Sequence, residues 1–72
     1  MDFGKRLSIL RKERNLTQKQ LAVELNVTER SVRAYENGDR HPDFVGLLYL
    51  ADYFNVSLDY LVGRSEIREI AR

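Results

Sequence analysis

The residues with the clearest chemical potential are Glu29, Arg30 and Arg33, which lie close together in the chain. An arginine guanidinium can donate two parallel hydrogen bonds to O6 and N7 of guanine, and a glutamate carboxylate can accept one from N4 of cytosine. A purely structural role is equally open at this point, because Glu29 and Arg33 are i,i+4 neighbours and can form an ion pair on a solvated helix face.

Catalytic and metal-binding residues are scarce. The chain has no Cys and only one His, His41, which leaves too few soft ligands for a typical zinc site and excludes disulfides. There is no Gly-rich phosphate loop and no nucleophile placed beside a base, and the carboxylates are scattered. We therefore expect no enzyme, no metal site and no cofactor, with His41 as a surface loop residue.

Length and charge suggest one small domain with an anionic partner. The 72 residues are 43% apolar and 32% charged, which is typical of a globular chain. Residues 1–42 hold nine Lys and Arg against six acids, whereas residues 43–72 hold three against five. A mixed solvated surface is the simpler alternative for this asymmetry. No segment resembles a membrane span or a signal peptide, so we expect a soluble, cytoplasmic protein.

The elements that would position these residues are five short helices. Apolar spacing and capping residues predict them over residues 2–14, 17–26, 28–37, 43–54 and 57–63, caps included. No segment alternates long enough for a strand. The prediction is an all-α fold, a compact five-helix bundle, whose expected core residues are Phe3, Leu7, Leu10, Leu21, Ala22, Leu25, Val27, Val32, Tyr35, Phe44, Leu47, Leu48, Ala51, Phe54, Leu58 and Leu61.

Two segments have no assigned place in that core. Val45, Tyr49 and Tyr53 form a second stripe on the fourth helix and are expected at the surface. The tail, residues 64–72, has Ile67, Ile70 and Ala71 at helical spacing but nothing of its own to pack on. We expect it to be either helical or a linker.

Gly46 lies inside the fourth helix at a cost of about 1 kcal/mol relative to Ala, for which close packing is one explanation.

Residues 18–37 have the spacing of a helix-turn-helix, with the small Ala22 allowing a close crossing. At these residues the sequence resembles the Cro/C1-type (XRE, phage-repressor-like) helix-turn-helix family. The resemblance extends over residues 3–63 through the runs LRKERNLTQ at 10–18, YENGDRHP at 35–42, LLYLA at 47–51 and NVSLDYL at 55–61. Asn26 stands where the family usually has Gly, and Asn also tolerates the left-handed turn. The resemblance implies a lambda-repressor-like DNA-binding domain over residues 1–63.

The resemblance also implies roles for individual residues. The family inserts the helix over about 28–37 into the major groove of double-stranded DNA, which maps base contacts onto Thr28, Glu29, Arg30, Arg33 and Ala34. Contacts to DNA phosphates map onto Thr17, Gln18, Lys19, Asn37 and Arg40. Capping alone is the alternative for Thr17, and a solvated charge is the alternative for Lys19.

Two further features follow from the family. Arg11 and Glu36 match an ion pair that fixes the angle between the first and third helices. Family members often dimerise on DNA, which maps dimer contacts onto Tyr53, Val56, Ser57 and Leu58, with Ile67 and Ile70 as additional candidates for self-association. The implied function is a sequence-specific transcriptional regulator, expected to be a repressor that binds a palindromic operator as a homodimer. The alternative is an antitoxin-like or other protein-interaction module of the same fold.

Overall fold

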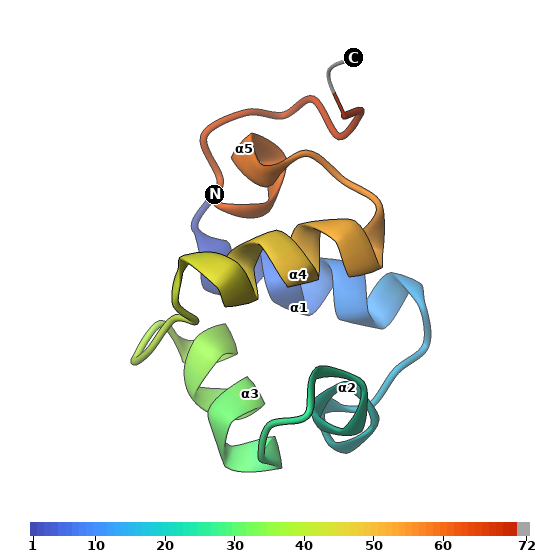
Figure 1. The fold of residues 1–72 in the computed structure, drawn as a ribbon, viewed down its shortest axis with the longest axis vertical. Helices are drawn as coiled ribbons and strands as arrows, with labels where there is room; N and C mark the ends of the chain where they lie inside the picture. The colour runs from blue at the N-terminus through green and yellow to red at the C-terminus, as the bar shows by residue number, and fades with distance from the viewer. Residues whose placement is uncertain (71–72) are drawn as a thin grey trace.

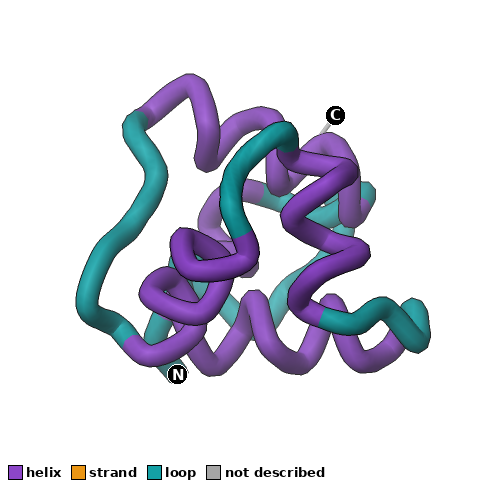
Figure 2. The backbone as a smooth tube through the Cα atoms, turned by 90° about the horizontal axis from the view of Figure 1, so that it is seen from below, coloured by secondary structure: helices purple, strands orange, loops and turns teal. Residues whose placement is uncertain are grey.

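The structure is a computed structural model, which describes residues 1–70. Within this range it has five helices and no strand: α1 (Phe3–Glu13), α2 (Gln18–Leu25), α3 (Glu29–Asn37), α4 (Phe44–Phe54) and α5 (Leu58–Leu61). In Figure 1, α2 and α3 lie at one end of the long axis and α5 at the other, with α1 and α4 between them. Short loops join the helices (Figure 2). The all-α prediction is confirmed. Among residues 1–70, every helix is too short or too polar to cross a bilayer.

Local capping explains where the helices begin and end. Every helix starts after an Asp, Ser or Thr whose side chain accepts a hydrogen bond from a backbone N–H in the first turn. At α2 the capping box is complete, because Gln20 Oε1 also accepts from the Thr17 N–H at 2.9 Å. Asn26 has φ 56° at the end of α2, so this asparagine adopts the left-handed conformation expected for the turn.

The core collects residues from every helix. Leu7, Leu21, Val32 and Leu61 are fully buried, and α3 packs mainly against α1 and α2. Gly4 permits the α1–α3 contact, because a Cβ atom there would lie 2.6 Å from the backbone oxygen of Glu36. The helices therefore cross with backbone nearly against backbone, which fixes how α3 is presented.

The expected core was wrong at three positions. Phe44 is 66% exposed and Leu48 39% exposed, whereas Leu50, which the predicted stripe leaves out, is buried. α4 is apolar nearly all round, so its periodicity does not specify one inward face. Val27, expected to be buried in the α2–α3 turn, is 37% exposed.

Gly46 has a packing role on α4. A Cβ atom there would lie 2.8 Å from Cβ of Pro42, which is buried in the loop before this helix. Glycine therefore lets this loop close tightly onto the first turn of α4.

Of the two alternatives expected for the tail, the helix is absent within the described residues. Residues 64–70 run back over α5 as bends and irregular backbone. The Ser57 N–H donates to the Arg68 oxygen at 2.8 Å, and Ser57 Oγ donates to the Ile67 oxygen at 3.0 Å. Arg68 also reaches Glu13 on α1, with the shorter of two contacts at 2.6 Å. The expectation for Ala71 lies outside the described residues.

A buried cation at the junction of α1, α5 and the tail escaped sequence reasoning. Arg6 is 1% exposed, and its guanidinium lies 3.8 Å from the ring centroid of Tyr60. Its Nη2 atom donates to Glu66 at 3.2 Å, while Nε has no hydrogen-bond partner within residues 1–70. Cation–π attraction to the desolvated ring compensates part of the cost of burying this charge.

Candidate nucleic-acid interface

α2 and α3 form a rigid two-helix unit with a tight turn. The Val27 N–H donates to the Ala22 oxygen at 3.0 Å, and Asn26 supplies the left-handed residue that reverses the chain. Ala22 is 4% exposed beneath the crossing with α3. On α3, Val32 and Tyr35 face the core, so the opposite side of the helix points outward. This is the helix-turn-helix geometry that the spacing predicts.

The outward side of α3 carries three charged residues. Arg33 Nη2 lies 3.1 Å from Glu29 Oε2, and their side chains are 54% and 44% exposed. The i,i+4 ion pair expected as the structural alternative is therefore present in the free protein. Arg30 is exposed and has no ion-pair partner among the described residues. Because an exposed pair of this kind contributes little to stability, Glu29 and Arg33 remain available to other partners.

The other two residues assigned to base contact have less free hydrogen-bonding capacity, although Thr28 is exposed. Thr28 Oγ1 accepts from the Ser31 N–H at 3.0 Å as the cap of α3, and it lies 3.0 Å from Ser31 Oγ. Ala34 is half-buried. The chemistry of the outward face therefore rests on the three charged side chains.

The N-terminus of α2 lies beside this face. Thr17 caps the helix, and Lys19 is exposed. Gln18, the first residue of α2, donates from Nε2 to Glu36 Oε1 at 3.1 Å. The first N–H groups of a helix have no partner within the helix, and the helix dipole adds positive potential there. This terminus therefore suits a phosphate oxygen.

The ion pair expected between Arg11 and Glu36 is present and buried. Arg11 Nε lies 2.6 Å from Glu36 Oε2, and Nη2 lies 3.1 Å from Oε1. The two side chains are 11% and 6% exposed. Arg11 Nη1 also donates to the oxygen of Leu16 at 2.8 Å. One guanidinium thus joins α1, the end of α3 and the residue that precedes the α2 cap.

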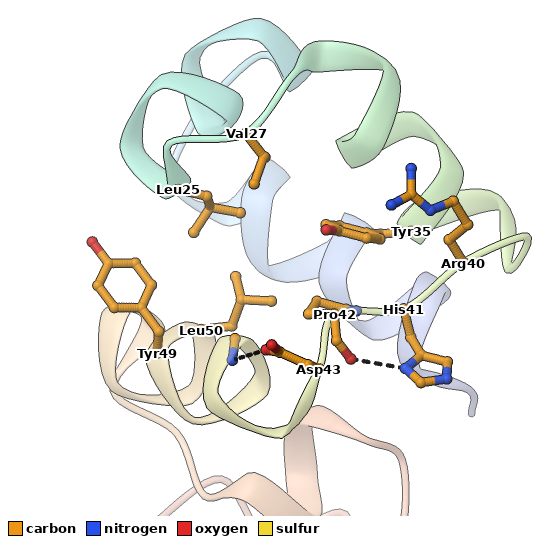
Figure 3. Close-up of a pocket in the computed structure, with 10 residues that line it drawn as sticks. Leu25, Val27, Tyr35, Arg40, His41, Pro42, Asp43, Tyr49 and Leu50 are labelled. Carbon is orange, nitrogen blue, oxygen red and sulfur yellow. Dashed lines mark hydrogen bonds between the residues drawn. The ribbon is translucent and has the colours of Figure 1, made fainter.

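The loop after α3 carries further polar residues. Asn37 ends α3 and Arg40 follows in the loop, and both are exposed. The Arg40 side chain extends from this loop near Tyr35 (Figure 3). His41 Nδ1 lies 2.8 Å from the Pro42 oxygen, an interaction within the loop itself. Four cationic side chains thus occupy the start of α2, the outer side of α3 and the loop beyond: Lys19, Arg30, Arg33 and Arg40.

The residues expected at a dimer contact are mostly occupied within the chain. Val56 is 4% exposed and belongs to the core, so its assignment to a dimer surface was wrong. Ser57 is tied to the tail and caps α5, while Tyr53 and Leu58 pack partly against the core. The exposed apolar surface on α4 includes Val45 and Tyr49, as expected, and also Phe44 and Leu48, which had been assigned inward.

Comparison with known proteins agrees with the helix-turn-helix geometry of α2 and α3. The sequence profile of the helix-turn-helix family matches residues 7–61. The chain is 42% identical over 67 residues to the HTH-type transcriptional regulator ImmR of Bacillus subtilis (strain 168). This match covers 93% of the chain and 53% of ImmR, so the chain spans about half the length of that relative.

Two solved structures share the fold. A transcriptional regulator from Listeria innocua superposes with a TM-score of 0.82 at 41% identity, covering 99% of this chain and 64% of that one. The P22 c2 repressor, crystallised with a synthetic operator, also gives a TM-score of 0.82, at 25% identity, covering 90% of this chain and 98% of the crystallised repressor chain.

Proposed function

The chain belongs to the Cro/C1-type helix-turn-helix family, and on that premise we propose that it binds a specific sequence in double-stranded DNA as a transcriptional repressor. The outward side of α3 is the observation that carries the proposal. It presents Glu29, Arg30 and Arg33 to solvent, while the buried Arg11–Glu36 pair and the Gly4 crossing hold the helix in place. The P22 c2 repressor, which has this fold, was crystallised with an operator, and this likeness supports the role of repressor.

In this proposal α3 enters the major groove and reads base edges. Arg30 is the strongest candidate for a bidentate contact to guanine, because its side chain is exposed and has no ion-pair partner among the described residues. Arg33 is available when its exposed pair with Glu29 opens, and Glu29 is then able to accept a hydrogen bond from cytosine. Thr28 and Ala34 contribute van der Waals contacts at the edges of this surface.

Contacts to the DNA backbone set the position of α3. We assign them to Thr17, Gln18 and Lys19 at the α2 N-terminus, and to Asn37 and Arg40 after α3. Contacts to phosphates fix the register of a protein on the duplex without reading its sequence. The proposed DNA binding involves no catalytic step. We place this binding in the cytoplasm.

We further propose that the protein binds DNA as a homodimer. The contact would combine the partly exposed Leu58, Tyr53 and Ser57 with the exposed apolar side chains of α4. Exposed apolar groups gathered on one surface are typical of association sites. Two copies related by a two-fold axis would bind half-sites about 34 Å apart, which is one turn of the duplex.

Selection of bound duplexes from a random pool, followed by sequencing, tests the proposal. We expect enrichment of a palindromic motif. Binding of the selected duplex should weaken with salt, with a slope of log K against log salt of about −0.9 for each phosphate neutralised. Arg64→Ala serves as a control, because it removes an exposed arginine of the tail, outside the helix-turn-helix, and should leave the selected motif unchanged. Failure to bind any duplex at low ionic strength would reject the proposal.

A further inference from the structure

The carboxylate of Glu36 is shared between two partners from different helices. Its two oxygens receive Nε and Nη2 of Arg11, at 2.6 and 3.1 Å, and Oε1 also receives Nε2 of Gln18 at 3.1 Å. We infer that Glu36 is a positioning residue for Gln18, so that the ion pair that orients α3 also orients the side chain at the α2 N-terminus. This inference rests on the proposed function, in which Gln18 contacts a DNA phosphate.

The hydrogen bond determines which way the Gln18 amide faces. An ionised carboxylate is only an acceptor, so the amide must turn its NH₂ group toward Glu36. The flipped amide would bring its oxygen against the carboxylate, where neither group can donate. One N–H of Gln18 is therefore used internally, while the second N–H is left for a partner outside the protein.

The fixed side chain lies where a phosphate is already favoured. Gln18 is the first residue of α2, and its backbone N–H is one of those left unpaired by the helix. A donor held beside these N–H groups adds a second point of attachment. Because the side chain is ordered before DNA arrives, binding does not have to order it.

The same network reaches the turn before α2. Arg11 donates to the Leu16 oxygen at 2.8 Å, one residue before the Thr17 cap. Both the start of α2 and the end of α3 are thus held by the one Arg11–Glu36 pair. A change in the Arg11–Glu36 pair would displace both the phosphate contact at the α2 N-terminus and α3. The pair would therefore affect DNA binding as well as stability.

A double-mutant cycle separates this role from a purely structural one. The background is Arg11→Met with Glu36→Leu, since replacing both partners of a buried ion pair with apolar residues is often neutral or stabilising. Gln18→Met is introduced into the wild type and into this background, and the affinity for the selected duplex is measured by fluorescence anisotropy at fixed salt. Folding of each variant is checked by circular dichroism.

We expect Gln18→Met to weaken DNA binding about three- to tenfold in the wild type, in line with the cost of ordering a flexible side chain, and less than twofold in the apolar background. Should that background fail to fold, the motion of the Gln18 side-chain NH₂ in the free wild type, described below, keeps the inference falsifiable. Equal effects in the wild type and the apolar background would overturn the inference.

A measurement without DNA distinguishes failure of this inference from failure of the proposed function. ¹⁵N relaxation of the Gln18 side-chain NH₂ should show restricted motion in the free wild type and free rotation in the Arg11→Met/Glu36→Leu protein. A mobile Gln18 amide in the wild type would refute the positioning role even if DNA binds well. Absence of DNA binding together with a rigid amide would refute the proposed function, and the role inferred for Glu36 with it.

Discussion

Replacement of Glu36 by Ala should destabilise the domain strongly. The substitution removes the carboxylate that pairs with Arg11, whose side chain is only 11% exposed in the wild type, and leaves the Leu16 oxygen as the remaining acceptor of its guanidinium among the described residues. Breaking a buried ion pair from one side typically costs about 3–5 kcal/mol, because the remaining charge is uncompensated. A domain of this size has a total stability of about 4–11 kcal/mol.

The expected change in thermal stability is therefore large. At about 4–8 °C per kcal/mol for a small domain, Glu36→Ala should lower Tm by at least about 12 °C. Thermal and urea unfolding followed by circular dichroism would measure it. Glu29→Ala is a matched control, because it removes a glutamate from the same helix and breaks a pair whose side chains are 44% and 54% exposed. That loss should stay below about 1 kcal/mol.

The comparison between Glu36→Ala and Glu29→Ala tests whether burial of the ion pair causes the loss of stability. Both replace Glu by Ala on α3, and the helix dipole favours Glu29 in the first turn but disfavours Glu36 in the last, so a larger loss for Glu36→Ala reports burial and not the position in the helix. If Glu36→Ala and Glu29→Ala melt within about 3 °C of each other, a margin below the ~4 °C expected for 1 kcal/mol, then the reasoning about the buried pair is refuted.

Further outcomes are expected at other positions. Gly4→Ala should cost about 1–3 kcal/mol in urea unfolding, because its Cβ would lie 2.6 Å from an α3 backbone oxygen; unchanged stability would contradict the tight crossing. The Arg68 hydrogen bond lowers the pKa of Glu13, so this exposed pair should contribute up to about 1 kcal/mol above pH 4.5 and lose it as the pH falls; the unfolding free energy of Glu13→Gln should converge with that of the wild type once the pH is below the lowered pKa, and a constant gap would refute the contribution. Arg30→Ala should relax preference at one base pair by about 1–3 kcal/mol in a binding-site selection. Arg40→Ala should instead weaken all duplexes alike and reduce the salt slope by about 1; an altered motif would argue against a phosphate contact.

The helix boundaries could be predicted from the sequence because their signals are local. Thr17, Thr28 and Ser57 each precede a helix and cap it through a side chain three residues from its partner, so no distant contact is needed to recognise them. The left-handed Asn26 was predictable for the same reason. The inward side of α4 was not, because apolar residues surround that helix and only its neighbours decide which side is covered.

Features that depend on residues distant in the sequence could not be predicted. Burial of Arg6 requires the Tyr60 ring and the Glu66 carboxylate, which lie more than fifty residues away in the chain. The tail is held at Ser57 through the backbone oxygens of Ile67 and Arg68, and backbone acceptors leave no signature in residue types. At the candidate site, family resemblance supplied the Arg11–Glu36 pair, but the link from Glu36 to Gln18 appears only when three helices are assembled.

The division of α3 into two sides has an evolutionary consequence. The fold depends on the inward residues, Val32 and Tyr35, while the outward positions contribute only one weak pair to stability. Surface substitutions away from such features usually change stability by less than about 0.5 kcal/mol. Positions 29, 30 and 33 can therefore diverge almost freely, and one scaffold can acquire new operators by exchanging a handful of side chains without passing through an unfolded ancestor.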